Sequence, residues 1–231
     1  MIRRFPLLRS AGDLAALVNE IGFLPFFRNA IPGFSIEEST PGELWFSEEE
    51  GPWEWKDPVI ERTNCAYGKF YQGKAMYISA AWFPDFANYR RDGYDFEGFY
   101  ENGFARSQDK KLIDALNRCG PLRTRQFKQE SGLSQKGDGK NFDSALARLQ
   151  MQTFLLIDGF EYAIDRQGKP YGWGIARYAT PEQRFGADFF DTVYERSPEE
   201  SGERVLHQLR KILPDAYDGD LVRLLGKRSY R

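Results

Sequence analysis

The chain has 231 residues with 32 Lys and Arg against 34 Asp and Glu, and its 41% hydrophobic and 29% charged residues are typical of a globular protein. It contains no run of eighteen apolar residues, and the segment after Met1 lacks a signal-peptide core, so we expect a cytoplasmic protein that does not span a membrane. The single histidine, His207, and the isolated cysteines Cys65 and Cys119 argue against histidine-based catalysis, metal sites and redox motifs, so we expect neither a metal nor a cofactor.

The first predicted element is a helix over residues 10–21. Ser10 can cap it, apolar residues recur at helical spacing along it, and Gly22 is expected to end it.

Residues 32–106 are rich in aromatic side chains and hold four of the five tryptophans. Within this stretch, residues 69–79 predict a β-hairpin around a Gln-Gly turn. We also expect a short strand at 44–46 and a helix over 79–89 that Pro84 interrupts.

Trp53 and Trp55 stand on either side of Glu54, so on a strand the two rings would share one face. Exposed aromatic rings stack on unpaired bases, and the nearby Arg90 and Arg91 could contact phosphates. The alternative is that rings at this density simply build and cover a core.

Residues 107–180 have the pattern of a winged helix-turn-helix. Ser107, Thr124 and Asn141 can each cap a short helix with an apolar stripe. Strand patterns follow at residues 153–157, 160–164 and 171–178. The turn between the last two strands would form the wing.

A local excess of positive charge accompanies these helices. Between Lys110 and Arg148 the chain carries nine Lys and Arg against four Asp and Glu, a balance of +5 in a chain whose formal charge is −2. This pattern predicts a nucleic-acid-binding surface, in which the third helix enters the major groove and the wing contacts the backbone. The candidate phosphate contacts are Arg123, Arg125, Lys128 and Lys136. The candidate base contacts are Lys140, Ser144, Arg148 and Gln152, and the wing tip carries Arg166 and Lys169. The alternative is a solvated basic face on a protein-binding module.

The remaining part of the chain is predicted to be helical. We expect one helix over 184–196, a second that starts at Ser197-Pro198, and a short last turn at 221–225. Residues 226–231 form a basic tail that is expected to fray.

The junction Leu149-Gln150-Met151-Gln152-Thr153 resembles the Gln-x-Gln (or Gln-x-Asp) motif of the AlkZ/YcaQ-type helix-turn-helix DNA glycosylases. The stretches 51–56 (GPWEWK) and 171–174 (YGWG) resemble bacterial AlkZ-related proteins. The resemblance implies that Gln150 and Gln152 would hold the water that attacks an alkylated nucleotide and would stabilise oxocarbenium-like charge. An amide is too weak a base to take a proton at neutral pH, so it would orient the water. The alternative is that both glutamines are ordinary residues at a helix end and a strand start.

We therefore predict an α+β protein with three parts: an aromatic-rich mixed module (1–106), a winged helix-turn-helix (107–180) and a C-terminal helical segment (181–231) that packs on the rest. The predicted function is binding of duplex DNA in a regulatory or genome-maintenance role. Two alternatives remain open at this point. One is a minimal DNA glycosylase that acts through Gln150 and Gln152, and the other is a non-catalytic module that binds a protein partner.

Overall fold

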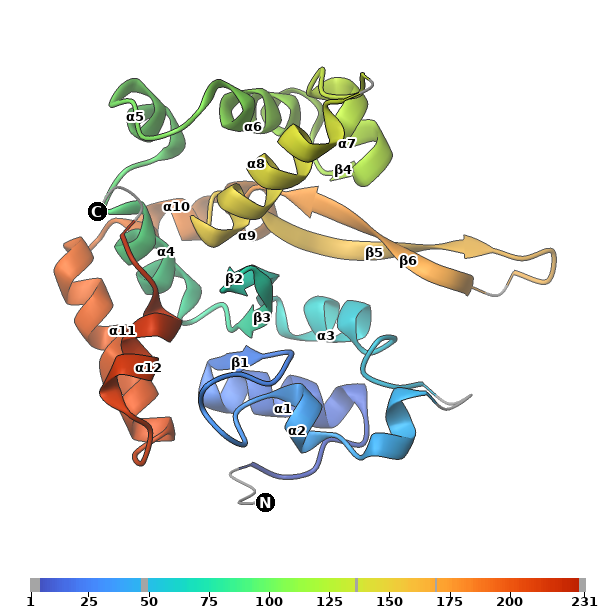
Figure 1. Cartoon of the computed structure of the whole chain (residues 1–231), viewed down its shortest axis with the longest axis vertical. Coiled ribbons are helices and arrows are strands. Elements are labelled where there is room, and N and C mark those ends of the chain that lie inside the picture. Colours follow the sequence, from blue (N-terminus) through green and yellow to red (C-terminus); the bar gives the residue numbers. More distant parts are fainter. Residues whose placement is uncertain (1–4, 47–49, 136, 169, 229–231) are drawn as a thin grey trace.

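The computed structural model describes residues 5–46, 50–135, 137–168 and 170–228, and it confirms a mixed α+β fold (Figure 1). The helices are α1 (Ala11–Ile21), α2 (Ile36–Ser39), the 3-10 helix η1 (Gly42–Trp45), α3 (Lys56–Thr63), α4 (Phe83–Arg91), α5 (Phe96–Glu101), α6 (Ser107–Cys119), α7 (Thr124–Glu130), α8 (Gly139–Met151), α9 (Pro181–Phe185), α10 (Ala187–Val193), α11 (Pro198–Ile212) and α12 (Asp218–Leu225). The strands are β1 (Phe23–Pro25), β2 (Ala66–Tyr71), β3 (Lys74–Ile78), β4 (Leu122–Arg123), β5 (Leu156–Ile164) and β6 (Pro170–Ala179).

The described strands form one antiparallel sheet in the order β1-β3-β2-β5-β6-β4. The pairing of Tyr67 with Ile157 joins the N-terminal hairpin β2–β3 to the long hairpin β5–β6. Figure 1 shows that the β5–β6 hairpin projects away from the rest of the molecule, with α3 below its base. The sheet therefore runs through both the N-terminal part and residues 107–179.

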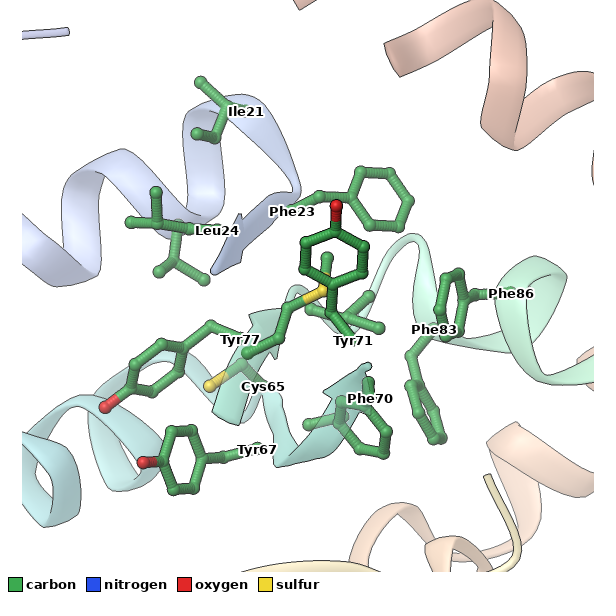
Figure 2. Packing of buried hydrophobic residues seen from close by; sticks show 14 of the residues in the cluster. Ile21, Phe23, Leu24, Cys65, Tyr67, Phe70, Tyr71, Tyr77, Phe83 and Phe86 are labelled. Atoms are coloured by element: carbon green, nitrogen blue, oxygen red, sulfur yellow. The ribbon is translucent and has the colours of Figure 1, made fainter. Parts of the chain in front are cut away.

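Two hydrophobic clusters fill the interior. The larger one joins α1, β1–β3 and α4 to the C-terminal helices, which contribute Phe189, Leu209 and Leu224. Figure 2 shows part of it, where the ring of Phe70 lies between β2 and α4 at 5.6 Å from the ring of Phe83. The smaller cluster is built from α5 to α8. Phe99 of α5 lies before the domain boundary expected after residue 106, yet it packs in this smaller cluster with residues that follow the boundary. The boundary itself stays a prediction.

Two elements of the N-terminal part form as residues close in sequence predict. Ser10 caps α1 by accepting a hydrogen bond from the Asp13 N–H at 3.1 Å, and Gly22 ends the helix with φ +85°, so this prediction is confirmed. The hairpin at 69–79 is also confirmed, with Gln72 and Gly73 both at positive φ in its turn.

Two N-terminal predictions were wrong. Of the strand expected at 44–46, Leu44 and Trp45 belong instead to the 3-10 helix η1, and Phe46 follows its end. The helix expected over 79–89 begins only at Phe83, and Pro84 lies in its first turn, where no amide donor is needed.

Boundaries in the second half also moved. The helix expected to start at Phe142, after a cap at Asn141, begins three residues earlier, at Gly139, with Asp138 before it. Strand β5 begins at Leu156 and runs unbroken to Ile164, so the two strands expected at 153–157 and 160–164 are one. The helix expected over 184–196 is divided into α9 and α10 at Gly186, which has φ +73°.

Candidate nucleic-acid interface

Residues 107–179, which we call the α6–β6 segment, place three helices against a hairpin. Leu116 of α6, Phe127 of α7 and Phe142 of α8 pack in the smaller cluster. Strand β4 pairs with β6 through Leu122 with Tyr178 and through Arg123 with Arg177, so the short strand between α6 and α7 becomes part of the sheet. The basic side chains of α7 and α8 are carried on this frame.

Several of the expected DNA contacts are exposed. Arg125 on α7, Lys140 and Ser144 on α8, and Arg166 in the hairpin turn all lie on the surface. Within the described part of the chain, none of the three cations among them makes an ion pair with a carboxylate. Lys136 and Lys169 lie outside the described residues. The α6–β6 segment therefore presents positive charge at α7, at the start of α8 and near the hairpin tip.

Two of the expected phosphate contacts have acidic partners. Arg123 forms an ion pair with Glu161 of β5, and the Lys128 Nζ lies 3.7 Å from the Asp143 Oδ1. Both pairs are partly solvent-exposed, so each is weak and a phosphate could compete for the cation.

Arg148 differs from the expectation that it is an exposed base contact. Its guanidinium grips the carboxylate of Asp109 on α6, with the Nε at 2.9 Å from the Oδ2 and the Nη2 at 2.5 Å from the Oδ1. The Asp109 side chain is completely buried. A bidentate pair with a buried carboxylate fixes the guanidinium, so Arg148 ties α8 to α6 and is not free to reach a base edge.

Gln150 is completely buried and uses both ends of its amide within the protein. The Nε2 donates to the Leu146 carbonyl at 3.1 Å, and the Oε1 accepts from the Lys69 backbone N–H at 3.0 Å. This geometry leaves Gln150 as a bridge between α8 and β2.

Gln152, two residues later, lies in a different environment. It is half-buried and lines a cavity of about 530 Å³ together with Arg223, Lys227 and Arg228. Its Oε1 is buried and has no hydrogen-bond partner among the described residues. An unpaired buried acceptor is costly unless a water or ligand donates to it. Of the two glutamines, Gln152 is thus the one that lines a cavity.

The backbone at this junction is strained. Thr153 has φ +66°, an uncommon value for a β-branched residue. The Thr153 N–H donates to the Gln150 carbonyl and the Phe154 N–H to the Leu149 carbonyl, both at 2.9 Å, which is the pattern of a Schellman motif. This turn ends α8 and aims the chain into β5.

Arg90 and Arg91, expected as phosphate contacts beside stacked bases, are both buried. Arg90 donates to the Met151 carbonyl at 2.8 Å and also to the carbonyls of Leu224 and Leu225, while Arg91 donates to the Thr153 carbonyl at 2.8 Å. These arginines therefore hold the C-terminal ends of α8 and α12, where the helix dipole favours a cation.

The two tryptophans expected to stack on bases, Trp53 and Trp55, differ in burial. Trp55 is 1% exposed and belongs to the larger cluster, so it cannot stack on a base, whereas Trp53 is half-buried. The two residues lie in a turn before α3 and not on a strand, so the alternation that would place their rings on one face does not apply.

A comparison with family models matches residues 8–226 to a family described as AlkZ related. The chain belongs to the AlkZ-related family. No curated protein and no solved structure was found to match it.

Two groups in this AlkZ-related protein were not anticipated from its sequence. Lys227 and Arg228, in the tail expected to fray, line the Gln152 cavity, and Arg228 forms ion pairs with Asp92 at 2.7 Å and with Glu199. Asn141, expected only as a helix cap, is exposed on the first turn of α8. No residue near Lys227 and Arg228 in sequence indicates that they pack beside Gln152. Asn141, in contrast, could have been predicted as a base contact, because an amide can pair with adenine.

Among the described helices, none has both the length and the apolar character needed to cross a membrane. In the same residues, no group of three or more His, Cys, Asp or Glu side chains is arranged to hold a metal ion.

Proposed function

We propose that the protein binds duplex DNA through the α6–β6 segment, in a genome-maintenance role, and that this segment is a winged helix-turn-helix. The supporting observation is its order of elements: helix, short strand, two helices and a hairpin, with the short strand paired to the far strand of that hairpin. In this arrangement α8 would be the recognition helix and the β5–β6 hairpin the wing.

Only the first half of α8 is available to enter a groove. Its second half is occupied by the Arg148–Asp109 pair and by the contact of Gln150 with β2. Direct contacts to bases would therefore come from Lys140, Asn141 and Ser144, which are all exposed. Arg125 and Arg166 would neutralise phosphates on either side of that groove.

The experiment is fluorescence anisotropy with a labelled random duplex at two salt concentrations. We expect binding that weakens steeply as salt rises, because phosphate contacts release counterions. Arg125→Ala and Arg166→Ala should each make the negative slope of log affinity against log salt shallower by about 0.9, the contribution of one phosphate contact. Arg210→Ala, which changes an exposed side chain on α11, is the matched control and should leave the slope unchanged. Absence of binding at low salt would overturn the proposal in favour of a protein partner.

The Gln152 cavity favours a second candidate function, the excision of alkylated bases. Gln152 would use its unpaired Oε1 to accept a hydrogen bond from the attacking water, while the strained turn at Thr153 fixes where the amide points. The cationic lining from Arg223 and Lys227 would hold the phosphates that flank the target nucleotide. Membership of the AlkZ-related family supports a role of the DNA-repair type. In this form of the hypothesis, Gln152 acts without Gln150.

The test is single-turnover release of base from an alkylated duplex. We expect Gln152→Ala to abolish release while DNA affinity and the melting temperature stay at their wild-type values. If the wild type releases no base, this candidate is removed and the DNA-binding proposal stands on its own measurement.

A further inference from the structure

A second cavity lies in the N-terminal part, between the loop after β1, α2, η1 and the turn before α3, and we call it the N-terminal groove. Its volume is about 570 Å³. Leu7, Phe27 and Trp45 form apolar parts of its wall, and all three are half-buried. Phe46, which also lines the groove, is 94% exposed. An aromatic ring held open to water beside an apolar groove indicates a surface that a partner covers.

The N-terminal groove is acidic. Glu37 and Glu38 line it together with one cation, Arg28, whose guanidinium lies 3.5 Å from the Glu37 carboxylate. The hydrogen bonds that Glu38 accepts come from a backbone N–H and a hydroxyl, which are neutral donors and do not cancel its charge. Residues 28–50 carry six Glu against the single Arg28, a balance of −5 in a chain whose formal charge is −2. Such a surface repels DNA and favours a partner that carries positive charge.

The chain itself presents a surface of this kind at the tip of the β5–β6 hairpin. Ile164, at the end of β5, is 58% exposed, and Arg166 in the turn is exposed and makes no ion pair with any residue that the structure describes. In the sequence, residues 164–170 (IDRQGKP) include two cations and one acid, so the charge of the tip is opposite in sign to that of the groove. Figure 1 shows that the hairpin projects from the molecule and that its turn lies apart from α2 and η1. The tip is therefore placed to reach the groove of a neighbouring copy.

We propose that the N-terminal groove is a docking site for the hairpin tip of a second copy of this chain. Ile164 would pack against Phe46 and Trp45, which removes apolar surface from water on both copies. Arg166 would lie beside Glu37, where the opposite charges set the orientation of the tip. The contact joins two different surfaces, so each copy keeps one free groove or tip, and assembly continues into a chain or closes into a ring.

This contact goes beyond the proposed binding of duplex DNA, yet it would limit that binding. Arg166 is also a proposed phosphate contact, so a tip that is seated in a neighbouring groove is withheld from DNA. Self-association is measured without DNA. Its outcome is therefore independent of whether the chain binds duplex.

The first experiment is sedimentation velocity of the full chain over a range of concentrations. We expect the average mass to rise above that of the monomer with a dissociation constant on the order of 100 μM, because a tip in a groove is smaller than a standard interface. The association should weaken as salt rises, because salt screens the opposite charges. A chain that stays monomeric at about ten times that concentration would overturn the proposal, and so would association that salt does not weaken.

Two variants that each remove one side of the contact give a sharper test. Phe46→Ala alters the groove and keeps the tip, whereas Ile164→Asp alters the tip and keeps the groove. Both side chains are exposed in the monomer, so neither change should disturb the core. We expect each variant alone to associate about tenfold more weakly than the wild type, or less. An equimolar mixture of the two should form heterodimers and nothing larger, because one intact groove then meets one intact tip.

Tyr217→Ala is the matched control. Tyr217 is 74% exposed and lies between α11 and α12, which Figure 1 shows on the opposite side of the molecule from the hairpin turn. This variant should associate as the wild type does, and an equal loss of association would show that any exposed ring suffices. A mixture of Phe46→Ala and Ile164→Asp that stays monomeric would overturn the pairing of groove with tip, as would wild-type association of either variant alone.

Discussion

The side-chain amide of Gln150 on α8 accepts a hydrogen bond from the backbone N–H of Lys69 on β2, at 3.0 Å. The two residues are 81 positions apart, and their contact joins the α6–β6 segment to the N-terminal hairpin. Gly68 permits the approach, because a Cβ at that position would lie only 3.2 Å from the Gln150 Oε1.

Replacing Gln150 should therefore destabilise the fold. Gln150→Leu leaves the part-buried Lys69 N–H without its acceptor, and we expect a loss of about 1–3 kcal/mol in the free energy of unfolding, measured by urea denaturation. Gln152→Ala is the matched control, since its Oε1 has no described partner to lose. A Gln150→Leu protein with wild-type stability would show that the bridge contributes nothing.

The ion pair of Arg148 with Asp109 should be one of the costliest polar contacts to break. Asp109→Asn keeps the shape of the side chain but leaves the guanidinium without its counter-charge, and we expect a loss of about 3–5 kcal/mol. In contrast, Asp143→Asn disrupts the exposed pair with Lys128 and should cost less than about 1 kcal/mol. Thermal melts of the two variants measure the difference, and equal melting temperatures would contradict it.

The two thiols should differ in reactivity. Cys65 is 1% exposed, and burial raises its pKa from 9.0 to about 11, whereas Cys119 is exposed. A thiol reagent in mildly alkaline buffer should label Cys119 at once and Cys65 only after unfolding. The folded protein keeps the Cys65 proton up to about 11 while the unfolded chain releases it above 9.0, so this residue makes stability fall as the pH rises between these values. Cys65→Ser should flatten that part of the pH profile.

Lys56 should titrate at a lower pH than an ordinary lysine. Its Nζ lies 4.5 Å from the ring centre of Phe160 and 5.3 Å from that of Trp53. Burial lowers the pKa of this amine from 10.5, and the carboxylate of Glu54 offsets part of the effect. Since the folded protein releases this proton more readily than the unfolded chain, the contribution of Lys56 to stability rises with pH up to 10.5.

The measurement for Lys56 is NMR titration of the reductively methylated protein, with Lys56→Arg to assign its signal. A midpoint at or above 10.5 would mean that contact with the two rings outweighs the loss of hydration.

Features that depend on neighbours in the chain could be predicted from the sequence. The cap of α1 at Ser10 and its stop at Gly22 depend on residues within one turn of each other. The turn at Gln72-Gly73 needs two residues at positive φ, and the strand-forming residues on either side favour the hairpin. The mixed fold and the resemblance to the AlkZ-related family were accessible in the same way.

The environment of each charged or polar side chain was decided only by the tertiary structure. Arg90 and Arg148 look like surface cations in the sequence, yet one holds two helix ends from inside the core and the other holds a buried carboxylate. The sequence also presents Gln150 and Gln152 as an equivalent pair. Their roles diverge because β2, distant in sequence, covers Gln150, while α12 and the residues after it leave a cavity beside Gln152. Burial depends on which segments distant in sequence pack together, and the spacing of residues within one segment does not predict that.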